Sequence, residues 1–353
     1  MASNARTTVL VTGGTGFVSL HCIAQLLTAG YKVRTTIRSE GKKENVLKAL
    51  KNAQPPVDAS KVEFVVADLL KDVGWAEAVK DVYVVHHVAS PFPGVQPKDE
   101  NELIRPAVDG TLRVLKAAKA SGTVKRVVVT SSAAAISHGV AYEKGKVFTD
   151  DDWSDPEGKS GYISAYQKSK TLAERAAWDF IEREGGDMEL TVVNPVGIFG
   201  PSLLLPCEST SVGLIQQMLE GRLPALPDLS FALVDVRDVA SLHLLVATRP
   251  EARGQRYLCV AGTGKSFSLV EIGAFLRTGL GNKASKVPTR TMPNVLTRLV
   301  SYVMPQLRSV VPDLGIRKQM SNEKARSLGW SPRSEEEAIV SCGQALIDAG
   351  ICK

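Results

Sequence analysis

The stretch VLVTGGTGFVS, residues 9–19, predicts the fold of the first half of the chain. A short apolar run ends at Gly13 and Gly16, and a helical pattern follows. Glycines placed directly after a strand let a pyrophosphate approach the amides and the positive end of the next helix. The alternative is a purely structural bend between strand and helix. The spacing is GxxGxxS, so Ser19 stands where a third glycine usually eases the packing of helix on strand.

Runs rich in Val and Ile alternate with longer amphipathic stretches through the first 195 residues. This alternation predicts strand and crossover-helix units that build a parallel sheet. We expect strands at residues 7–12, 31–37, 62–67, 81–89, 125–131 and 190–194. We expect helices at residues 19–29, 101–121 and 164–184, each closed by glycine. The predicted fold class is therefore α/β, with a Rossmann-type doubly wound parallel sheet.

The pattern changes after Pro195. Residues 197–230 are rich in Pro, Leu, Gly and Ser, a strand-like RYLCVAG follows at 256–262, and the remainder is mostly helical with proline breaks. We interpret these segments as a smaller, discontinuous, mostly helical lobe that binds the substrate. The nucleotide-binding domain is expected at residues 1–196 plus about 231–262, and the substrate lobe at about 197–230 plus 263–353.

The end of the second predicted strand indicates which dinucleotide binds. NAD enzymes usually place an acid there for the adenosine ribose, whereas NADP enzymes need cations for the additional phosphate. Here the strand ends at Ile37, Arg38 follows, and Lys42 comes shortly after. A guanidinium binds phosphate through two parallel hydrogen bonds, so Arg38 and Lys42 are predicted to clamp the 2′-phosphate of NADP(H). The alternative is a solvated basic loop. Asp68, after the third strand, is expected to contact the adenine amino group or to cap the following turn.

The segment YISAYQKSK, residues 162–170, contains two tyrosines and two lysines. Tyr166 and Lys170 are four residues apart and therefore share one face of a helix, whereas Tyr162 has no lysine at that spacing. A phenol has a pKa near 10, and lowering it by three units takes about 4 kcal/mol. An ammonium about 4 Å away at an effective dielectric constant near 20 supplies energy of that order. Decoration of a surface helix is the alternative reading of this spacing.

Ser131 and Ser132 end the fifth predicted strand, at the edge where open parallel sheets bind ligands. A hydroxyl, a phenol and a fixed cation suffice for carbonyl reduction. In this hypothesis hydride comes from a nicotinamide and the proton from Tyr166, while Ser132 orients the substrate. Lys170 holds the nicotinamide ribose and lowers the phenol pKa. Without the other two groups, the serine pair would be read as a strand-end cap.

Together these motifs resemble the extended short-chain dehydrogenase/reductase family over essentially the whole chain. The resemblance is carried by TGGTGFV (12–18), ADLL (67–70), HHVASP (86–91), TSSAA (130–134), YQKSK (166–170), NPVGIFGP (194–201) and VDVRDVA (234–240). Within the family, the chain is most similar to the dihydroflavonol 4-reductase-like branch of aldehyde and ketone reductases. That similarity is carried by RPAVDGTLRVLKAA (105–118), DDDWSD (150–155) and EKARSLGWSPRSEEEAI (323–339).

The resemblance implies NADPH-dependent reduction of a carbonyl group to an alcohol. Its catalytic serine, tyrosine and lysine match Ser132, Tyr166 and Lys170. Its cofactor contacts match Gly13, Gly16, Phe17, Arg38, Lys42, Asp68, Leu69, Ala89, Pro195 and Val196. Sugar-nucleotide epimerases carry asparagine where this chain has Ala107, which disfavours that activity. The other readings are an NAD-dependent hydroxysteroid-type dehydrogenase and a non-catalytic NADP-sensing regulator.

Composition narrows the class of protein. The chain has 353 residues, 44% of them hydrophobic, a net charge of +6 and five scattered cysteines without CxxC spacing. We expect neither a disulfide framework nor a metal site. Lysine and arginine are spread along the chain, so we expect no nucleic-acid partner. The sequence shows no long apolar run and no leader pattern at its start, so we expect a cytoplasmic protein without a membrane anchor, either a monomer or a homodimer.

We interpret several weaker sequence motifs as structural features and not as functional sites. AGTGKS at residues 261–266 resembles a phosphate loop but lacks its first glycine, so we treat it as unrelated. His86 and His87 are expected to pack or to hydrogen-bond the backbone instead of binding metal. Asp235 and Asp238 are expected to tie the two lobes together.

We assign roles to the apolar segments at residues 294–303, 91–95 and 203–206 from their pattern and position in the sequence. Residues 294–303 place Val295, Leu296 and Leu299 on one helical face, and we expect this helix to cover the core in preference to a membrane or a partner. Residues 91–95 and 203–206 are expected to line the substrate cleft between the sheet and the smaller lobe.

Overall fold

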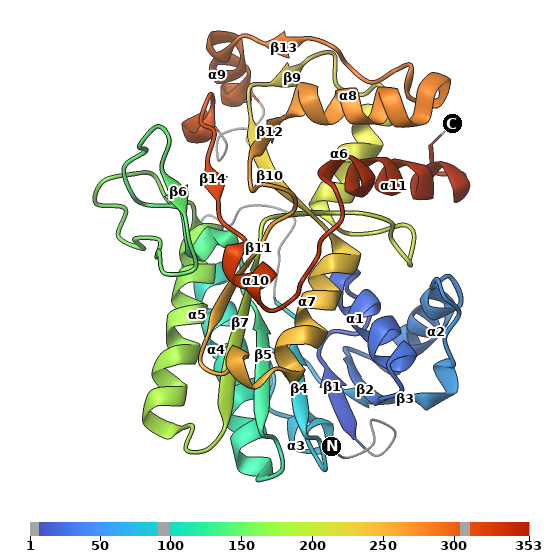
Figure 1. Ribbon diagram of the computed structural model, residues 1–353, viewed down its shortest axis with the longest axis vertical. Helices are drawn as coiled ribbons and strands as arrows, with labels where there is room; N and C mark the ends of the chain where they lie inside the picture. The colour runs from blue at the N-terminus through green and yellow to red at the C-terminus, as the bar shows by residue number, and fades with distance from the viewer. Residues whose placement is uncertain (1–6, 91–98, 304–310, 353) are drawn as a thin grey trace.

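A computed structural model describes residues 7–90, 99–303 and 311–352. Its centre is a seven-stranded sheet in the order β11-β7-β5-β4-β1-β2-β3, with every neighbouring pair parallel (Figure 1). The strands are β1 (Thr8–Val11), β2 (Lys32–Ile37), β3 (Val62–Val66), β4 (Val84–His87), β5 (Arg126–Thr130), β7 (Glu189–Pro195) and β11 (Arg256–Cys259). The strand order reverses between β1 and β4, which is the switch point where such sheets bind ligands. The predicted fold class is confirmed.

Helices cover both faces of this sheet. The first face carries α1 (Phe17–Thr28), α2 (Lys43–Lys51) and α7 (Val236–Thr248), and the second carries α3 (Trp75–Ala78), α4 (Asn101–Ser121) and α5 (Ala165–Glu184). The α4 helix has the bounds that the sequence predicts, and it ends at Gly122 with φ +68°. Leu10 and Val127 are fully buried, which explains why the strands read as nearly continuous apolar runs.

The parallel register brings the strand ends together at one edge. Val11 of β1 lies beside His86 of β4, and Thr130 of β5 lies beside Val193 of β7. The residues that follow each strand therefore share that edge, which faces the smaller group of elements in the upper part of Figure 1. A motif after any of these strands is thus placed at a single site.

The remaining elements form a second core. A three-stranded sheet, β12-β10-β8, contains β8 (Gly197–Phe199), β10 (Ser230–Asp235) and β12 (Ser266–Ser268). The helices α6 (Thr210–Leu219), α8 (Leu269–Leu280) and α11 (Glu335–Asp348) bury apolar side chains such as Ile215, Leu276 and Ile339 against one another. The residues 256–262 contribute β11 to the large sheet, while β10 joins the small one. The division into two lobes stays our proposal.

Short elements complete the described chain. Two strand pairs are formed by β6 (Val147–Phe148) with β14 (Gln319–Met320) and by β9 (Leu226–Pro227) with β13 (Thr291–Met292), and α9 (Asn294–Val303) and α10 (Glu323–Ser327) are the other α-helices. Short 3-10 helices lie at Glu40–Lys42, Ala59–Lys61, Ala133–Ala135, Pro250–Ala252, Gly281–Ala284 and Val311–Asp313.

The α9 helix corrects one expectation. Its apolar side chains point outward: Val295, Leu296 and Leu299 are 69%, 47% and 60% exposed, while Thr297 and Ser301 are buried. The expectation that this helix covers the core with its apolar face is therefore wrong. The polar face packs inward because its hydroxyls are satisfied within the helix region, Thr297 donating to the Pro293 carbonyl and Ser301 to the Arg298 carbonyl.

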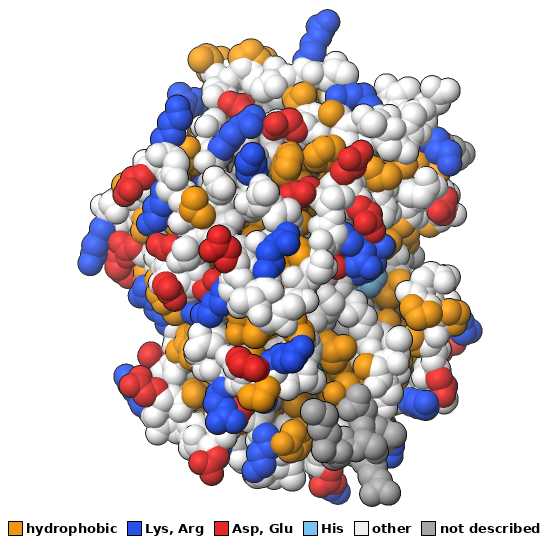
Figure 2. Space-filling view, in the orientation of Figure 1, with side chains coloured by type: hydrophobic (Ala, Val, Ile, Leu, Met, Phe, Trp, Pro, Cys, Tyr) orange, Lys and Arg blue, Asp and Glu red, His pale blue; other side chains and the backbone are white. Residues whose placement is uncertain are grey.

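The surface is of mixed charge. Figure 2 shows Lys and Arg side chains interspersed with Asp and Glu over the viewed face, as the spread of these residues along the sequence suggests. Within the described part of the chain, no helix combines the length and the apolar character that crossing a membrane requires.

Candidate active site

The glycine turn after β1 is held tightly against the neighbouring strand ends. Gly13 has φ +72°, and its N–H donates to the Thr36 hydroxyl at 2.9 Å. A Cβ at Gly13 would lie 2.9 Å from the Cβ of Ala89, so a larger residue does not fit there. Gly16 begins α1 without a side-chain cap. The turn thus offers bare backbone and a helix N-terminus to an anionic group.

Ser19 explains why the third glycine is dispensable. Its hydroxyl is buried and donates to the carbonyl of Thr12 at 3.1 Å, so it ties α1 to the end of β1. The ring of Phe17 lies at the start of α1, and its edge meets the ring of His21 with centroids 6.1 Å apart. Phe17 is therefore at the position where the resemblance places a cofactor contact.

The cationic side chains in and after β2 differ in the contacts that they form. Arg34 forms an ion pair with Glu63 at 2.7 Å and donates to the Lys80 carbonyl at 2.6 Å. Arg38 and Lys42 are exposed, and neither forms an ion pair or a side-chain hydrogen bond with any residue that the structure describes. The geometry thus leaves Arg38 and Lys42, and not Arg34, available for a phosphate.

Asp68 and Leu69 follow β3. One carboxylate oxygen of Asp68 accepts from the N–H of Leu70 at 3.0 Å, which is the capping alternative. A contact from Asp68 to adenine stays a prediction. The Leu69 side chain packs on the apolar core under α4. A Cβ at Gly110 of α4 would lie 3.1 Å from the Cβ of Leu69. A contact of Leu69 with a cofactor stays a prediction.

Pro195 and Val196 lie where β7 leaves the large sheet. Pro195 is buried, and the N–H of Val196 donates to the Cys259 carbonyl of β11 at 3.3 Å. The N–H of Ser131, after β5, donates to the Val193 carbonyl at 2.8 Å. The Pro195–Val196 segment therefore borders the same edge as the serine pair.

The α5 helix presents the tyrosine at its first turn. Ser164 caps the helix in a reciprocal arrangement with Gln167, in which the Ser164 N–H donates to the Gln167 side chain at 2.8 Å. This cap fixes the turn that contains Tyr166. The phenol of Tyr166 forms a hydrogen bond with the side chain of Ser132. Tyr162, before the helix, is 47% exposed.

Burial controls the protonation of this tyrosine and lysine. It raises the pKa of Tyr166, and the hydrogen bond to Ser132 opposes that rise. Burial also lowers the pKa of Lys170 to about 8, and the carboxylate of Glu174 opposes that change. The expected lowering of the phenol pKa by Lys170 is thus absent in the protein alone, because desolvation disfavours the phenolate more strongly. At neutral pH the phenol keeps its proton and can act as an acid.

A threonine and a histidine connect the lysine to the glycine turn. The Thr12 hydroxyl accepts from the N–H groups of Val88 and Ala89, each at 3.0 Å, and so donates to Nδ1 of His87 at 3.0 Å. Burial, together with the charge of Lys170, lowers the pKa of His87 to about 3. His87 is thus a neutral acceptor for the Thr12 hydroxyl, and the charge of Lys170 contributes to the lowering of its pKa.

The second histidine of this strand has a partner distant in sequence. His86 Nδ1 lies 3.4 Å from His243 Nδ1, and His243 Nε2 lies 2.9 Å from the Thr130 hydroxyl. Burial lowers the pKa of His86 to about 4. The described residues contain no group of three or more metal-ligating side chains. His86 and His87 are buried within the protein, as one of the two alternatives expects, and their side chains hydrogen-bond His243 and Thr12.

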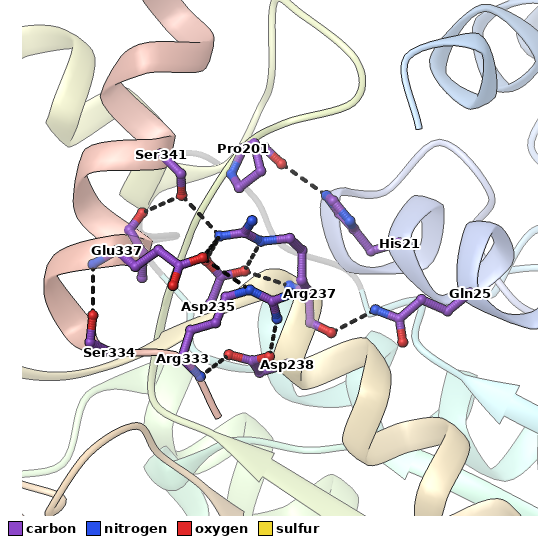
Figure 3. A network of polar contacts seen from close by, with 11 residues as sticks. His21, Gln25, Pro201, Asp235, Arg237, Asp238, Arg333, Ser334, Glu337 and Ser341 are labelled. Carbon is purple, nitrogen blue, oxygen red and sulfur yellow. Dashed lines mark hydrogen bonds and ion pairs between the residues drawn. The ribbon is translucent and has the colours of Figure 1, made fainter. Parts of the chain in front are cut away.

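The polar network in Figure 3 joins α1, α7 and the C-terminal segment. Asp235 pairs with Arg237 at 2.7 Å, and Asp238 accepts from the Arg333 N–H at 2.7 Å. His21 donates to the Pro201 carbonyl at 2.8 Å. Asp238 thus joins α7 to the C-terminal segment, and Asp235 holds Arg237, which pairs with Glu337 of α11 at 3.2 Å. The role of the two aspartates in tying two lobes together stays a prediction.

Two other segments have packing roles. In AGTGKS, the carbonyl of Gly264 accepts from the N–H of Met320 at 2.9 Å, and a Cβ at Gly264 would overlap the Met320 carbonyl, so this turn is filled by β14. Leu203 is buried, and its carbonyl accepts from the side chain of Asn52, which follows α2, at 3.0 Å. A role of residues 203–206 in the substrate cleft stays a prediction, and residues 91–95 lie outside the described residues.

Sequence reasoning missed one buried charged residue of this site. Glu174 is one helical turn after Lys170, is 1% exposed, and accepts hydrogen bonds from Ser131 and Asn194. The same four-residue spacing that selects Tyr166 with Lys170 also selects Lys170 with Glu174. The ion pair of Glu174 with Arg256, 82 positions later, has no such signal.

The chain is similar to known proteins in sequence and in fold. Residues 9–260 match the family model described as the NAD dependent epimerase/dehydratase family. A ketoreductase of Aspergillus niger, azaE, is 35% identical over 306 residues, which are 82% of this chain and 87% of the relative. The crystal structure of yeast methylglyoxal/isovaleraldehyde reductase Gre2 complexed with NADPH is 27% identical with a TM-score of 0.76, covering 98% of this chain and 99% of that one. Vestitone reductase from alfalfa is 26% identical with a TM-score of 0.73, covering 97% and 99%.

Proposed function

Because this chain belongs to the NAD-dependent epimerase/dehydratase family, among the extended short-chain dehydrogenases/reductases, we propose that it is an NADPH-dependent carbonyl reductase. It reduces an aldehyde or a ketone to the alcohol through Ser132, Tyr166 and Lys170. The supporting observation is the hydrogen bond between Tyr166 and Ser132, with Lys170 one turn away, at the edge that also holds the glycine turn.

The residues present fit NADPH. The turn at Gly13 and Gly16 leaves a helix N-terminus open to the pyrophosphate, and the segment at Ala89 abuts that turn. Arg38 and Lys42 are exposed and have no ionic partner among the described residues, so they can offer two cations to the 2′-phosphate. When bound, NADPH supplies the hydride that reduces the carbonyl carbon.

The chain itself supplies orientation and the proton. The hydroxyl of Ser132 donates a hydrogen bond to the carbonyl oxygen of the substrate. That oxygen binds beside both Ser132 and the Tyr166 phenol, which hydrogen-bond each other in the protein alone. The phenol of Tyr166, kept protonated by burial, gives its proton to that oxygen as negative charge develops. The ammonium of Lys170 stabilises the phenolate that remains and binds the nicotinamide ribose.

Two rival functions make different use of these residues. A sugar-nucleotide epimerase or an NAD-dependent dehydrogenase has no need of a cation pair after β2, where this chain has Arg38 and Lys42. A non-catalytic NADP-sensing regulator has no need of a phenol bonded to a serine at the ligand-binding edge. Relatives described as ketoreductase and as methylglyoxal/isovaleraldehyde reductase favour a carbonyl substrate.

NADPH oxidation against a panel of small aldehydes and aryl ketones tests the proposal. We expect turnover with at least one carbonyl and a loss of about 100-fold or more in Tyr166→Phe. Tyr162→Phe, which changes a half-exposed phenol just before the same helix, is the matched control and should retain turnover. Tight NADPH binding without turnover of any carbonyl would instead favour the regulator.

A further inference from the structure

Glu174 lies beneath the proposed catalytic residues and is engaged from several elements. It is 1% exposed on α5. One oxygen accepts from the Ser131 hydroxyl at 2.5 Å and from the Asn194 amide at 2.7 Å. The other accepts from Arg256 at 2.5 Å and from the Trp178 indole at 3.4 Å. A buried carboxylate is costly unless it is paired and fully hydrogen-bonded, and here four donors satisfy it.

These donors come from the strand ends that border the site. Ser131 precedes Ser132 at the end of β5, and Asn194 is near the end of β7. The same Asn194 amide also donates to the backbone carbonyl of Ser132 at 3.2 Å. One carboxylate therefore joins α5, which carries Tyr166, to the strand end that carries Ser132.

Resting on the proposed function, we propose that Glu174 is a positioning residue for carbonyl reduction, whose carboxylate holds the Ser132 strand end against α5 and supplies the negative charge that Lys170 faces. Glu174 is one turn from Lys170 on the same helix, so their side chains share a face. The carboxylate raises the lysine pKa against the lowering by burial. The carboxylate thus helps to retain the ammonium in a partly buried site.

The surroundings of Lys170 leave Glu174 as its source of opposite charge. On α5 the lysine also shares a face with Tyr166, which is protonated and neutral at working pH. From β4 it meets His87, whose pKa of about 3 makes it neutral as well. No charge from α4, which packs along α5, or from Arg256 appreciably shifts the lysine pKa among the described residues. Removing the charge of Glu174 should therefore lower the pKa of Lys170 directly.

The experiment measures the pH profile of NADPH oxidation in Glu174→Gln. The amide keeps the shape and one acceptor oxygen, while its NH2 cannot accept the hydrogen bonds made to the other oxygen. Because the negative charge is lost, we expect the alkaline limb to move about one pH unit lower. We expect kcat to fall above the shifted limb. The Kd of NADPH should stay within about twofold when it is measured below that limb, because Lys170 still carries its proton there. Glu189→Gln is the control: Glu189 also pairs with a buried arginine, Arg126 at 2.6 Å, but at the opposite end of β7.

A structural role alone predicts a different outcome. In that case both glutamine variants would lose stability, and the alkaline limb of the pH profile would lie at the wild-type pH in both. That result would overturn the proposal. Should Glu174→Gln not fold because Arg256 is left uncompensated, the double variant Glu174→Gln, Arg256→Met removes both buried charges and restores balance. The limb should still move to lower pH, since Arg256 does not act on Lys170, and an unmoved limb overturns the proposal.

The outcome is separable from the proposed function itself. If Tyr166→Phe is inactive and Glu174→Gln has the wild-type profile, the reductase assignment stands and the role of Glu174 is wrong. If Tyr166→Phe keeps full turnover, the proposed function fails first. A Lys170→Arg variant provides the further check: a guanidinium does not deprotonate in this range, so adding Glu174→Gln should no longer move the limb.

Discussion

Replacing Lys170 by methionine should stabilise the protein while abolishing its activity. Burial lowers the pKa of Lys170 from 10.5 to about 8 in the folded chain. Each pKa unit corresponds to about 1.4 kcal/mol, so holding the ammonium in place at neutral pH costs about 3 kcal/mol. Because the side chain is only partly buried, water screens part of this cost, and we expect Lys170→Met to gain about 1 to 3 kcal/mol. Methionine keeps the length of the chain without its charge.

The sign of the pH dependence identifies the cause. Below about pH 8 the lysine is charged in both the folded and the unfolded chain, so wild type bears the full cost. As pH rises from about 8 to the unfolded value near 10.4, the folded lysine is already neutral and the cost disappears. The advantage of Lys170→Met should therefore be largest near neutral pH and vanish above about pH 10.5.

Urea or thermal unfolding of the protein without cofactor measures the gain. For 353 residues the unfolding entropy is about 0.7 kcal/mol per degree, so the midpoint should rise by about 1 to 4 °C. Lys168→Met is the matched control, since Lys168 lies on the same helix and pairs at the surface with Glu100 at 2.9 Å. Its stability should change by less than about 1 kcal/mol and its turnover should persist. A Lys170→Met protein that is no more stable than wild type at pH 7 would refute the reasoning.

Other consequences can be checked in the same preparations. In wild type, kcat/KM for NADPH oxidation should fall as pH rises through about 8, because Lys170 then loses its proton; a profile flat to pH 10 would contradict this. Arg38→Ser should weaken NADPH binding about tenfold or more and leave NADH binding almost unchanged, as measured by fluorescence titration of both cofactors. Leu299→Ser on the outward face of α9 should change the unfolding free energy by no more than about 0.5 kcal/mol, whereas a core position would lose several times that amount.

The fold was predictable because its signals are local and repeated. Strands such as β1 and β5 are short Val-rich runs that are almost completely buried, and α4 and α5 end at Gly122 and Gly185, as the sequence pattern indicates. The α9 helix was not predictable by the same rule. Its apolar stripe has helical spacing, but periodicity does not tell which face meets the core, and here Thr297 and Ser301 do.

The site divides in the same way. Tyr166, Lys170 and Ser132 could be proposed from the sequence because each belongs to a short motif at a strand end or on one helix face. The pairs that the tertiary fold brings together could not: Arg256 reaches Glu174 across 82 positions, and His243 reaches His86 across 157. The sign of the change in the phenol pKa was also wrong for the protein alone, since the sequence carries no measure of burial.

The protonation states around the reacting atoms leave Lys170 as the group that titrates near neutral pH. His87 is neutral down to a pKa of about 3, burial keeps the Tyr166 phenol protonated, and the Glu174 carboxylate is paired with Arg256. The ionisation of Lys170 alone then decides whether the site is in its active protonation state. If Glu174 were absent, burial would push that ionisation further below pH 8 and the ammonium would be lost under working conditions. The buried carboxylate therefore sets the upper end of the pH range in which this arrangement can donate a proton from Tyr166.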